Sequence, residues 1–296
     1  MSQVPASKSP YGAECRGLFG PNGLVIKGAK WVQVGADMSG LQLRGLAHEL
    51  FPLDGGAYCK IVTEGDVHWA HCQAMGLVGA DEERDKHNGL HDILREKGAK
   101  TFGYAYIFGC GKGKSGLIVR DALMTARAKN PEWGFLFDRF FKKANGGVRS
   151  NAAVGGTVRQ SFDERLNLGT LQDLLKEEMR ENDNHIIGLD GRKVPCRSDH
   201  SALNFKLSSS EAILCKEWIC NSCDEMERRG YKFGWDGDFV FMIWNHDEVQ
   251  VACKETISEE VGQVLVSCAK EAGIKLGFRV PLASEFKIGR NWDECH

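Results

Sequence analysis

The sequence lacks the features of membrane, secreted and disulfide-rich proteins. No stretch approaches the eighteen apolar residues of a membrane span, and the N-terminal Met-Ser-Gln-Val-Pro is not followed by the apolar core of a signal peptide. The eleven cysteines are odd in number and follow no framework spacing, which favours reduced thiols in a cytoplasmic protein. Cys220 and Cys223 form a CxxC without a second pair, so we predict helix residues there and no zinc ligands.

Strong charge of one sign is absent as well. The formal net charge is −2, so no basic field covers the molecule, and a nucleic-acid partner would need a local patch and metal ions. With 42% hydrophobic and 26% charged residues over 296 positions, the composition is that of a globular protein with a large core. We predict one domain or two closely packed ones, and no membrane partner.

A phosphate-binding P-loop is also missing. Residues 109–115, Gly-Cys-Gly-Lys-Gly-Lys-Ser, look like one at first sight, but the first glycine of the P-loop pattern would fall on Phe108. No strand is expected before this segment either. We therefore exclude a P-loop.

The most informative stretch present is residues 240–253, which has the pattern of a β-hairpin. Two β-rich runs flank Asn-His-Asp-Glu at 245–248, and polar residues alternate with Val249 and Val251 in the second run. A charged hairpin tip can be no more than a solvated turn. His246, Asp247 and Glu248 nevertheless lie where metal or substrate could reach them.

A second acidic site precedes this hairpin by some two hundred residues. Residues 31–36 read as a short strand that leads to Asp37, and residues 41–50 read as a helix with Arg44 and His48 on one face. Ser39 and Gln42 have the spacing of a capping box. A carboxylate at a strand end before a helix can present a metal ligand rigidly.

Helices dominate the middle of the chain, over residues 55–110 and 117–180. Within residues 89–108, Lys100, Tyr104 and Phe108 are four residues apart and share a face, which suits a flat ligand with a phosphate. Further on we expect a hairpin turn at 189–194, helices at about 208–230 and 258–273, and a strand at 278–280. Aromatic residues at helical spacing are also typical of an ordinary core.

Three segments, in this order, resemble motifs A, B and C of family A, the DNA polymerase I family, and look closest to replicative polymerases of short-tailed phages. They are residues 37–48 (Asp-Met-Ser-Gly-Leu-Gln-Leu-Arg-Gly-Leu-Ala-His), residues 100–109 (Lys-Thr-Phe-Gly-Tyr-Ala-Tyr-Ile-Phe-Gly) and His246-Asp247-Glu248. The resemblance spans almost the whole chain. It implies template-directed transfer of a nucleotide from a dNTP to a primer 3′-hydroxyl.

The resemblance also assigns catalytic roles. Asp37 and Asp247 would hold two Mg²⁺ ions, for which Mn²⁺ can substitute, and Glu248 would be an accessory ligand. Lys100 would bind the triphosphate and protonate the departing pyrophosphate. The residues implied in dNTP binding are His68, Lys100, Tyr104, Gln42, Arg95 and Phe108. Those implied in primer–template binding are His246, Arg197, His200, Asn204 and Arg44.

The chain departs from the family pattern at four positions. Gln42 replaces the glutamate that acts as steric gate against ribonucleotides, and Phe108 replaces the tyrosine that pairs with it. We expect Gln42 to exclude a 2′-hydroxyl by bulk. Glu96 occupies the place of an arginine, with Arg95 one position away, and Ser208 occupies that of a glutamine that reads the minor groove.

The resemblance implies an α+β fold with an antiparallel palm sheet and helical fingers. We predict a first palm part at 1–64, fingers at 65–185 and a second palm part at 186–296. Because only 36 residues precede Asp37, we expect either one half of a split polymerase, with the thumb and exonuclease domains on a separate chain, or a fragment. The alternatives are an inactive polymerase remnant that binds such a partner and a single-subunit RNA polymerase. Glu248 and the Phe102-Gly103 pair favour a DNA polymerase over the latter.

Overall fold

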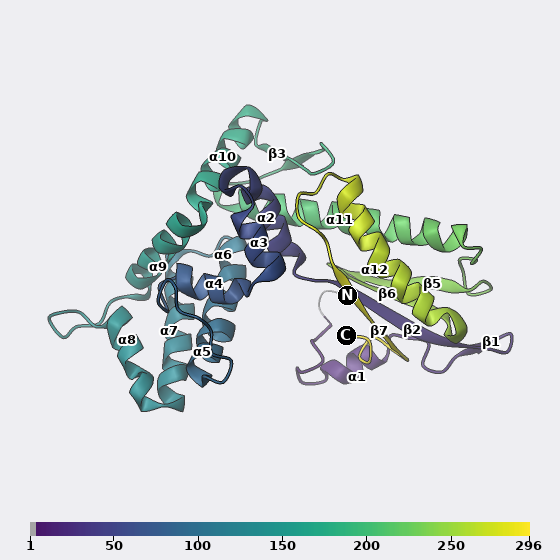
Figure 1. The fold of residues 1–296 in the computed structure, drawn as a ribbon, viewed down its shortest axis with the longest axis horizontal. Helices are drawn as coiled ribbons and strands as arrows, with labels where there is room; N and C mark the ends of the chain where they lie inside the picture. The colour runs from purple at the N-terminus through teal and green to yellow at the C-terminus, as the bar shows by residue number, and fades with distance from the viewer. Residues whose placement is uncertain (1–3) are drawn as a thin grey trace. The chain divides into compact units, whose positions relative to one another are not determined.

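The computed structural model describes residues 4–296 and contains two compact units (Figure 1). Unit 1 comprises the chain up to His48, residues 189–191 and residues 207–296, and it contains an antiparallel sheet. Unit 2 comprises residues 49–188 and 192–206 and is mainly helical. Two helices, α2 (Leu41–Asp54) and α11 (Ala202–Arg228), each contribute residues to both units. The predicted α+β class is confirmed.

The sheet of unit 1 is built around its longest strand, β2 (Ala29–Met38). Strand β6 (Glu248–Lys254) pairs with one side of β2 and is followed by β5 (Phe239–Asn245). Strands β1 (Val25–Ile26) and β7 (Ser284–Gly289) pair with β2 as well. All pairings are antiparallel, and in register Asp37 lies opposite both Glu248 and Glu285. Three carboxylates therefore form a row across one end of the sheet.

The predicted hairpin is confirmed. Strand β5 ends at Asn245 and β6 begins at Glu248, so His246 and Asp247 form a two-residue turn. His246 has a φ of +57°, a left-handed conformation that histidine tolerates better than most residues. The indole N–H of Trp244 donates to the His246 carbonyl at 2.7 Å and holds the turn closed.

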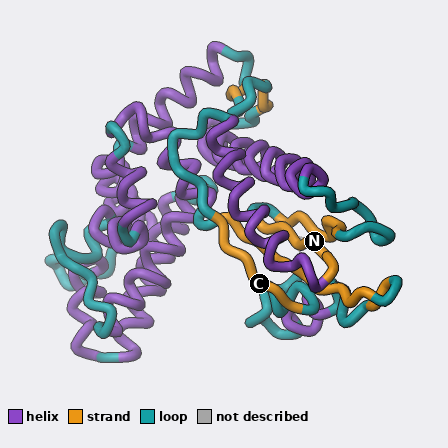
Figure 2. The backbone as a smooth tube through the Cα atoms, turned by 45° about the vertical axis from the view of Figure 1, so that its right-hand side comes forward, coloured by secondary structure: helices purple, strands orange, loops and turns teal. Residues whose placement is uncertain are grey.

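Helices α11 and α12 (Ser258–Lys275) cover the sheet of unit 1 (Figure 2). Gly262 of α12 lies so close to β7 that an added Cβ would be 2.3 Å from the ring of Phe286. The indole of Trp218 on α11 donates to the Leu265 carbonyl at 2.7 Å and joins the two helices. A short helix, α1 (Gly12–Gly17), precedes the sheet, and its Arg16 guanidinium stacks 4.5 Å from the ring of Trp292.

Unit 2 confirms the expected helical character of the middle of the chain. Its helices are α3 (Ala57–Glu64), α4 (Val67–Ala74), α5 (Gly89–Ile93), η1 (Leu94–Lys100), α6 (Thr101–Ile107), α7 (Lys112–Lys129), η2 (Pro131–Trp133), α8 (Gly134–Phe141), α9 (Asn151–Leu166), α10 (Leu168–Glu181) and η3 (Asp199–Ser201). The hairpin turn expected at 189–194 joins β3 (His185–Ile187) to β4 (Lys193–Pro195), with Gly191 at a φ of +81°.

Two predicted boundaries are wrong. Helix α11 begins at Ala202 instead of about 208, so Asn204 is helical. Residues 278–280 are not a strand; the strand near the C-terminus is β7. Phe278 instead stacks on His48 at 4.5 Å, and the Arg279 N–H donates to His48 Nδ1 at 3.0 Å, so side chains of α2 hold this segment in place of a strand partner.

The predicted capping box is also wrong. Gly40 has a φ of +58°, which is not helical, so Ser39 does not directly precede the first turn of α2. The amide of Gln42 instead hydrogen-bonds the carboxylate of Glu211. Helix α2 itself runs four residues past the predicted end and includes Pro52.

The expected continuous helix over 89–108 exists but changes its winding. Between α5 and α6, η1 is a π-helix, the type that recurs at functional sites. All eleven cysteines are free, and Cys220 and Cys223 lie on α11 as predicted. Within residues 4–296, no helix is both long enough and apolar enough to span a bilayer.

Candidate active site

The two predicted metal ligands lie next to each other in unit 1. Asp37 is the penultimate residue of β2, and Asp247 is in the β5–β6 turn. The N–H of Met38 donates to the carbonyl of Asp247 at 2.9 Å and ties the strand end to the turn. Backbone hydrogen bonds thus fix both aspartates on a rigid part of the fold.

Like charges crowd this position. Burial raises the pKa of Asp37 to about 7, and the negative charges of Asp247, Glu248 and Glu285 add to the rise. Burial also raises the pKa of Asp247, although its own backbone N–H and His246 oppose the shift. Two neighbouring aspartates whose charged forms are both destabilised are an environment that a hard cation relieves.

The donor set fits Mg²⁺. Within residues 4–296, no three or more His, Cys, Asp or Glu side chains are grouped as a closed metal cage. Mg²⁺ is typically bound by one or two carboxylates together with water and substrate phosphates, so Asp37 and Asp247 suffice for such a site.

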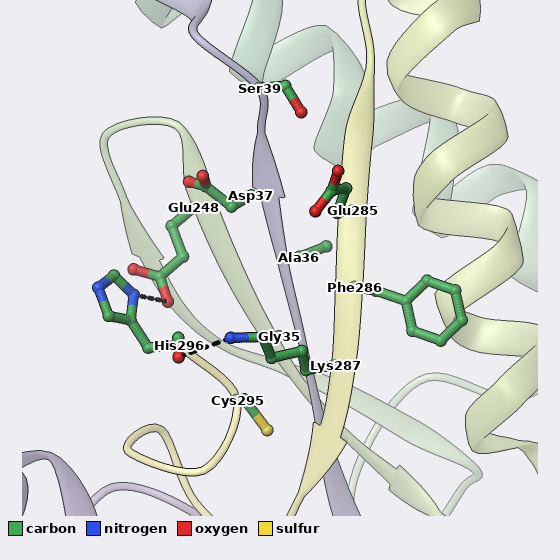
Figure 3. A pocket seen from close by; sticks show the side chains of 10 residues that line it. All are labelled: Gly35, Ala36, Asp37, Ser39, Glu248, Glu285, Phe286, Lys287, Cys295 and His296. Carbon is green, nitrogen blue, oxygen red and sulfur yellow. Dashed lines mark hydrogen bonds and ion pairs between the residues drawn. The ribbon is translucent and has the colours of Figure 1, made fainter. Parts of the chain in front are cut away.

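Glu248 differs from the two aspartates because its side chain is buried and its carboxylate accepts several hydrogen bonds from other side chains. Its Oε1 accepts from the Trp292 indole at 2.6 Å and from the Gln250 amide at 2.6 Å. It also accepts from His296 Nδ1 at 3.2 Å (Figure 3). Lys287 on β7 in turn donates to the His296 carbonyl at 2.9 Å. Glu248 therefore anchors the C-terminal segment beside the acidic row.

A pocket opens along this row between β2, β7 and the C-terminal segment. Figure 3 shows Asp37 and Glu285 on neighbouring strands, with Ser39 at one end of the pocket and His296 toward the other. The pocket brings the carboxylates within reach of solvent and small ligands.

A second group of predicted residues lies together in unit 2. The rings of His68 and Tyr104 are 6.1 Å apart, and Arg95 and Lys100 are near enough to influence His68. Desolvation lowers the pKa of His68 to about 4, and the charges of Arg95 and Lys100 contribute to that decrease. His68 is therefore a neutral imidazole near pH 7.

The cations of this second group have carboxylate partners. Arg95 Nε donates to Asp66 Oδ2 at 2.7 Å, and its Nη1 bonds Glu96. Lys100 Nζ lies 3.3 Å from Glu96 Oε2. Burial alone would raise the pKa of Asp66, but hydrogen bonds from Arg95, the Trp69 N–H and Arg84 outweigh it and hold that pKa below its usual value.

Close helix packing orients the second group. An added Cβ on Gly103 would lie 2.8 Å from His71 Nδ1, so α6 and α4 touch at this glycine. His71 Nε2 and the Tyr58 hydroxyl form a 2.8 Å hydrogen bond, which fixes the His71 ring. Gly103 allows Lys100 and Tyr104 to stand against α4, which carries His68.

The remaining predicted residues have varied settings. Phe108, at the end of α6, is 53% exposed. Gly109 lies close to the His200 backbone, because an added Cβ would be 2.9 Å from the His200 carbonyl oxygen. Arg197 and His200 are exposed, and Asn204 is half-buried. Arg44 in unit 1 donates to the backbone carbonyls of Ser39, at 2.7 Å, and Pro281.

The sequence analysis missed two acidic residues near the site, Glu285 and Glu211. Glu285 is a charged residue within a strand next to Asp37, a position that the misplaced strand at 278–280 concealed. Glu211 could have been noticed as a charge on the apolar face of α11 that also carries Leu207, Leu214 and Trp218.

Comparison with known proteins gives a consistent result. The chain is 36% identical over its whole length to the DNA-directed DNA polymerase of Enterobacteria phage T3, and 36% identical to that of Escherichia phage T7. It is 28% identical, over 92% of its length, to the DNA-directed DNA polymerase of Escherichia phage Phieco32. The chain belongs to the DNA polymerase I family.

This family A chain spans 38% of the length of the T3 and T7 relatives. A solved structure of the polymerase domain of Pol1 from M. smegmatis, in complex with DNA primer-template and dNTP, matches the whole chain with a TM-score of 0.68. At 17% identity, that match supports the family A fold alone. No family model matches the sequence.

Proposed function

We propose that this chain forms the palm and fingers of a DNA-directed DNA polymerase, with the palm in residues 1–64 and 186–296 and the fingers in residues 65–185. In the structure, residues 49–64, 186–188 and 192–206 of this predicted palm group with the helical unit. The observation that carries the proposal is that Asp37 and Asp247 lie side by side at the end of the sheet, tied by the bond from the Met38 N–H to the Asp247 carbonyl. Desolvation and like charges raise the pKa of both aspartates there. The polymerase relatives, which match the chain over its whole length, support the same reaction.

The acidic row would serve the transfer of a nucleotide from a dNTP to the primer 3′-hydroxyl. Asp37 and Asp247 would hold two Mg²⁺ ions, or Mn²⁺ in their place, which supply Lewis-acid activation and neutralise phosphate charge. Glu248 would keep the C-terminal segment against the hairpin through its bonds to Trp292 and His296. His246, exposed at the turn, would contact the primer end.

The second group would bind the nucleotide. Lys100 would exchange its contact with Glu96 for the triphosphate and pass a proton to the leaving pyrophosphate. Neutral His68 would donate a hydrogen bond to a phosphate oxygen, and Tyr104 would lie by the sugar and base. Arg95 could bind the triphosphate only if its ion pairs with Asp66 and Glu96 broke, so we expect a smaller contribution from Arg95 than from Lys100.

Six further residues would contact the nucleotide or the DNA. Gln42 would face the sugar and exclude a 2′-hydroxyl by bulk, and Phe108, which follows α6, would contribute to dNTP binding. His200, Asn204, Arg197 and Arg44 would contact primer–template DNA, largely at its backbone and minor groove. The reaction would take place in the cytoplasm of a host cell, since the relatives named above are phage proteins.

The test is primer extension with Mg²⁺ and dNTPs, with Asp247→Ala as the inactive variant. The matched control is Asp236→Ala, because Asp236 is also an aspartate of unit 1 but is 90% exposed and pairs only with Lys27 among the described contacts. We expect extension by the wild type and the control, and a loss of about 10³-fold or more in Asp247→Ala.

The same assay tests whether the chain needs a separate thumb-bearing partner for activity, and whether it is instead an inactive polymerase remnant. If the chain alone is silent, the segment of a phage relative that this chain does not match is added as a second polypeptide. Extension that then depends on Asp247 supports a polymerase working with a thumb-bearing partner. Silence in both assays, or extension that persists in Asp247→Ala, contradicts the proposal.

A further inference from the structure

Glu211 is a buried carboxylate in unit 1 that the proposed reaction does not use. It lies on α11 in the same apolar face as Leu207, Leu214 and Trp218 and is 8% exposed. Its Oε2 has no hydrogen-bond partner within residues 4–296. A buried and incompletely paired carboxylate destabilises a fold, so its presence here calls for a functional reason.

Three polar residues at or near the acidic site interact with Glu211. The Gln42 side chain on α2 hydrogen-bonds its carboxylate. His246 Nδ1, at the hairpin tip, lies 3.8 Å from Glu211 Oε1. Asp247 is close enough for its negative charge to act on Glu211. Glu211 thus connects helix α2 to the turn that carries Asp247.

The identity of residue 42 depends on this contact. A glutamine amide can donate a hydrogen bond to the Glu211 carboxylate, which has only acceptors when ionised. A glutamate at position 42 would place a second carboxylate against Glu211, with Asp247 adding a third negative charge nearby. Gln42 and Glu211 are therefore complementary, and a carboxylate is tolerated at one of the two positions only.

We propose that Glu211 is a positioning residue that holds the Gln42 amide in one conformation and thereby sets the discrimination between deoxyribonucleotides and ribonucleotides. The inference rests on the proposed function, in which Gln42 faces the nucleotide sugar. A glutamine without this partner regains side-chain rotamers and can turn away from a 2′-hydroxyl. A fixed glutamine stays in its path, so rejection depends on the Glu211 contact.

The experiment measures kcat and KM for one dNTP and its matching rNTP in primer extension, with the thumb-bearing polypeptide present if the chain requires it. We expect Glu211→Ala to raise the ratio of rNTP to dNTP kcat/KM about tenfold, mainly through a lower KM for the rNTP. Glu211→Gln retains an acceptor for Gln42 and should keep the ratio within about twofold of the wild type. Glu217→Ala, which removes another glutamate of α11 that pairs with Lys275, is the matched control and should leave the ratio unchanged.

A second measurement reports on the contact without enzymatic activity. In thermal unfolding, Gln42→Glu should lower the midpoint by several degrees, and addition of Glu211→Gln should restore most of that loss. An unchanged nucleotide ratio in Glu211→Ala overturns the inference. So does a Gln42→Glu effect of equal size with and without Glu211→Gln.

The two proposals fail differently. If neither the wild type nor any variant extends primers, the proposed function is wrong. Thermal unfolding of Gln42→Glu with and without Glu211→Gln still shows whether Glu211 and Gln42 are coupled. If the wild type extends primers but the ratio of rNTP to dNTP kcat/KM is the same in Glu211→Ala, only the inference about Glu211 is wrong.

Discussion

The two groups of polar residues in this protein balance their charges in opposite ways. In unit 1, Asp37 lies beside Asp247, Glu248 and Glu285, and desolvation together with these like charges raises its pKa to about 7. In unit 2, Asp66 accepts hydrogen bonds from Arg84 and Arg95, and its pKa lies below the usual value. One charged aspartate is destabilised by its surroundings and the other is stabilised by them.

This difference separates charges that serve the fold from charges kept for a ligand. Paired groups such as Asp66 and Arg95 contribute to the stability of their own unit. Crowded like charges such as Asp37 and Asp247 reduce stability unless a cation binds, a common property of functional sites. The direction of the pKa shift thus indicates which residues we expect to be functional.

The largest effect that this comparison predicts concerns Asp37→Asn. We expect primer extension to fall about 10³-fold, because the metal ligand that we propose at Asp37 is lost. In EDTA at a pH of about 8, above the raised pKa, the same variant should unfold at a higher temperature than the wild type, because the repulsion from Asp247, Glu248 and Glu285 is removed. The measurements are primer extension and differential scanning calorimetry.

Millimolar Mg²⁺ should reduce the difference in unfolding temperature between Asp37→Asn and the wild type, because Mg²⁺ binds the wild type more strongly than the variant. If Asp37→Asn loses activity and also unfolds at a lower temperature than the wild type in EDTA, Asp37 stabilises the fold. Asp37 and Asp66 would then both have structural roles.

The next effect concerns Asp66→Asn in unit 2, which should reduce stability at neutral pH. The substituted asparagine keeps the capacity to cap α4, but the charged bonds to Arg84 and Arg95 are lost, so we expect a decrease of about 2–3 kcal/mol in the free energy of unfolding. Urea unfolding of both proteins at several pH values gives the measurement.

The pH dependence of this effect has a defined sign. Because the folded-state pKa of Asp66 is lower than its unfolded value of about 4, its contribution is fully present above that value. It is lost as the pH falls through the folded-state pKa. The wild type and Asp66→Asn should therefore converge in stability in strong acid, and a difference that stays constant down to a pH of about 2 would contradict the assignment.

The smallest effect concerns Gly103→Ala. The added Cβ would meet the fixed His71 ring at 2.8 Å, so α6 must shift from α4, and we expect a loss of about 1–2 kcal/mol. Gly156→Ala in α9 is the matched control, because its Cβ would meet only the flexible Lys112 side chain at 3.6 Å and alanine favours a helix. Urea unfolding that shows equal effects at both positions would rule out a close contact at Gly103.

Much of the fold could be predicted from the sequence because its signals are local. Alternation of apolar residues around 245–248 predicted the β5–β6 hairpin, and the strand before Asp37 lies within β2. The strand predicted at 278–280 failed because Phe278 and Arg279 are held by His48, more than two hundred residues away. The π-helix between α5 and α6 likewise has no signature in the helical spacing of Lys100 and Tyr104.

For the site, the sequence specifies the acidic and basic residues and their order along the chain. The motifs named Asp37, Lys100 and Asp247 because residue type and spacing are local properties. Which polar side chains pair with one another became known from the folded structure. The contacts of Asp66 with Arg95 and of Gln42 with Glu211 join residues 29 and 169 positions apart. Pairing follows from which helices and strands pack together, and the spacing of residues along one element does not determine that packing.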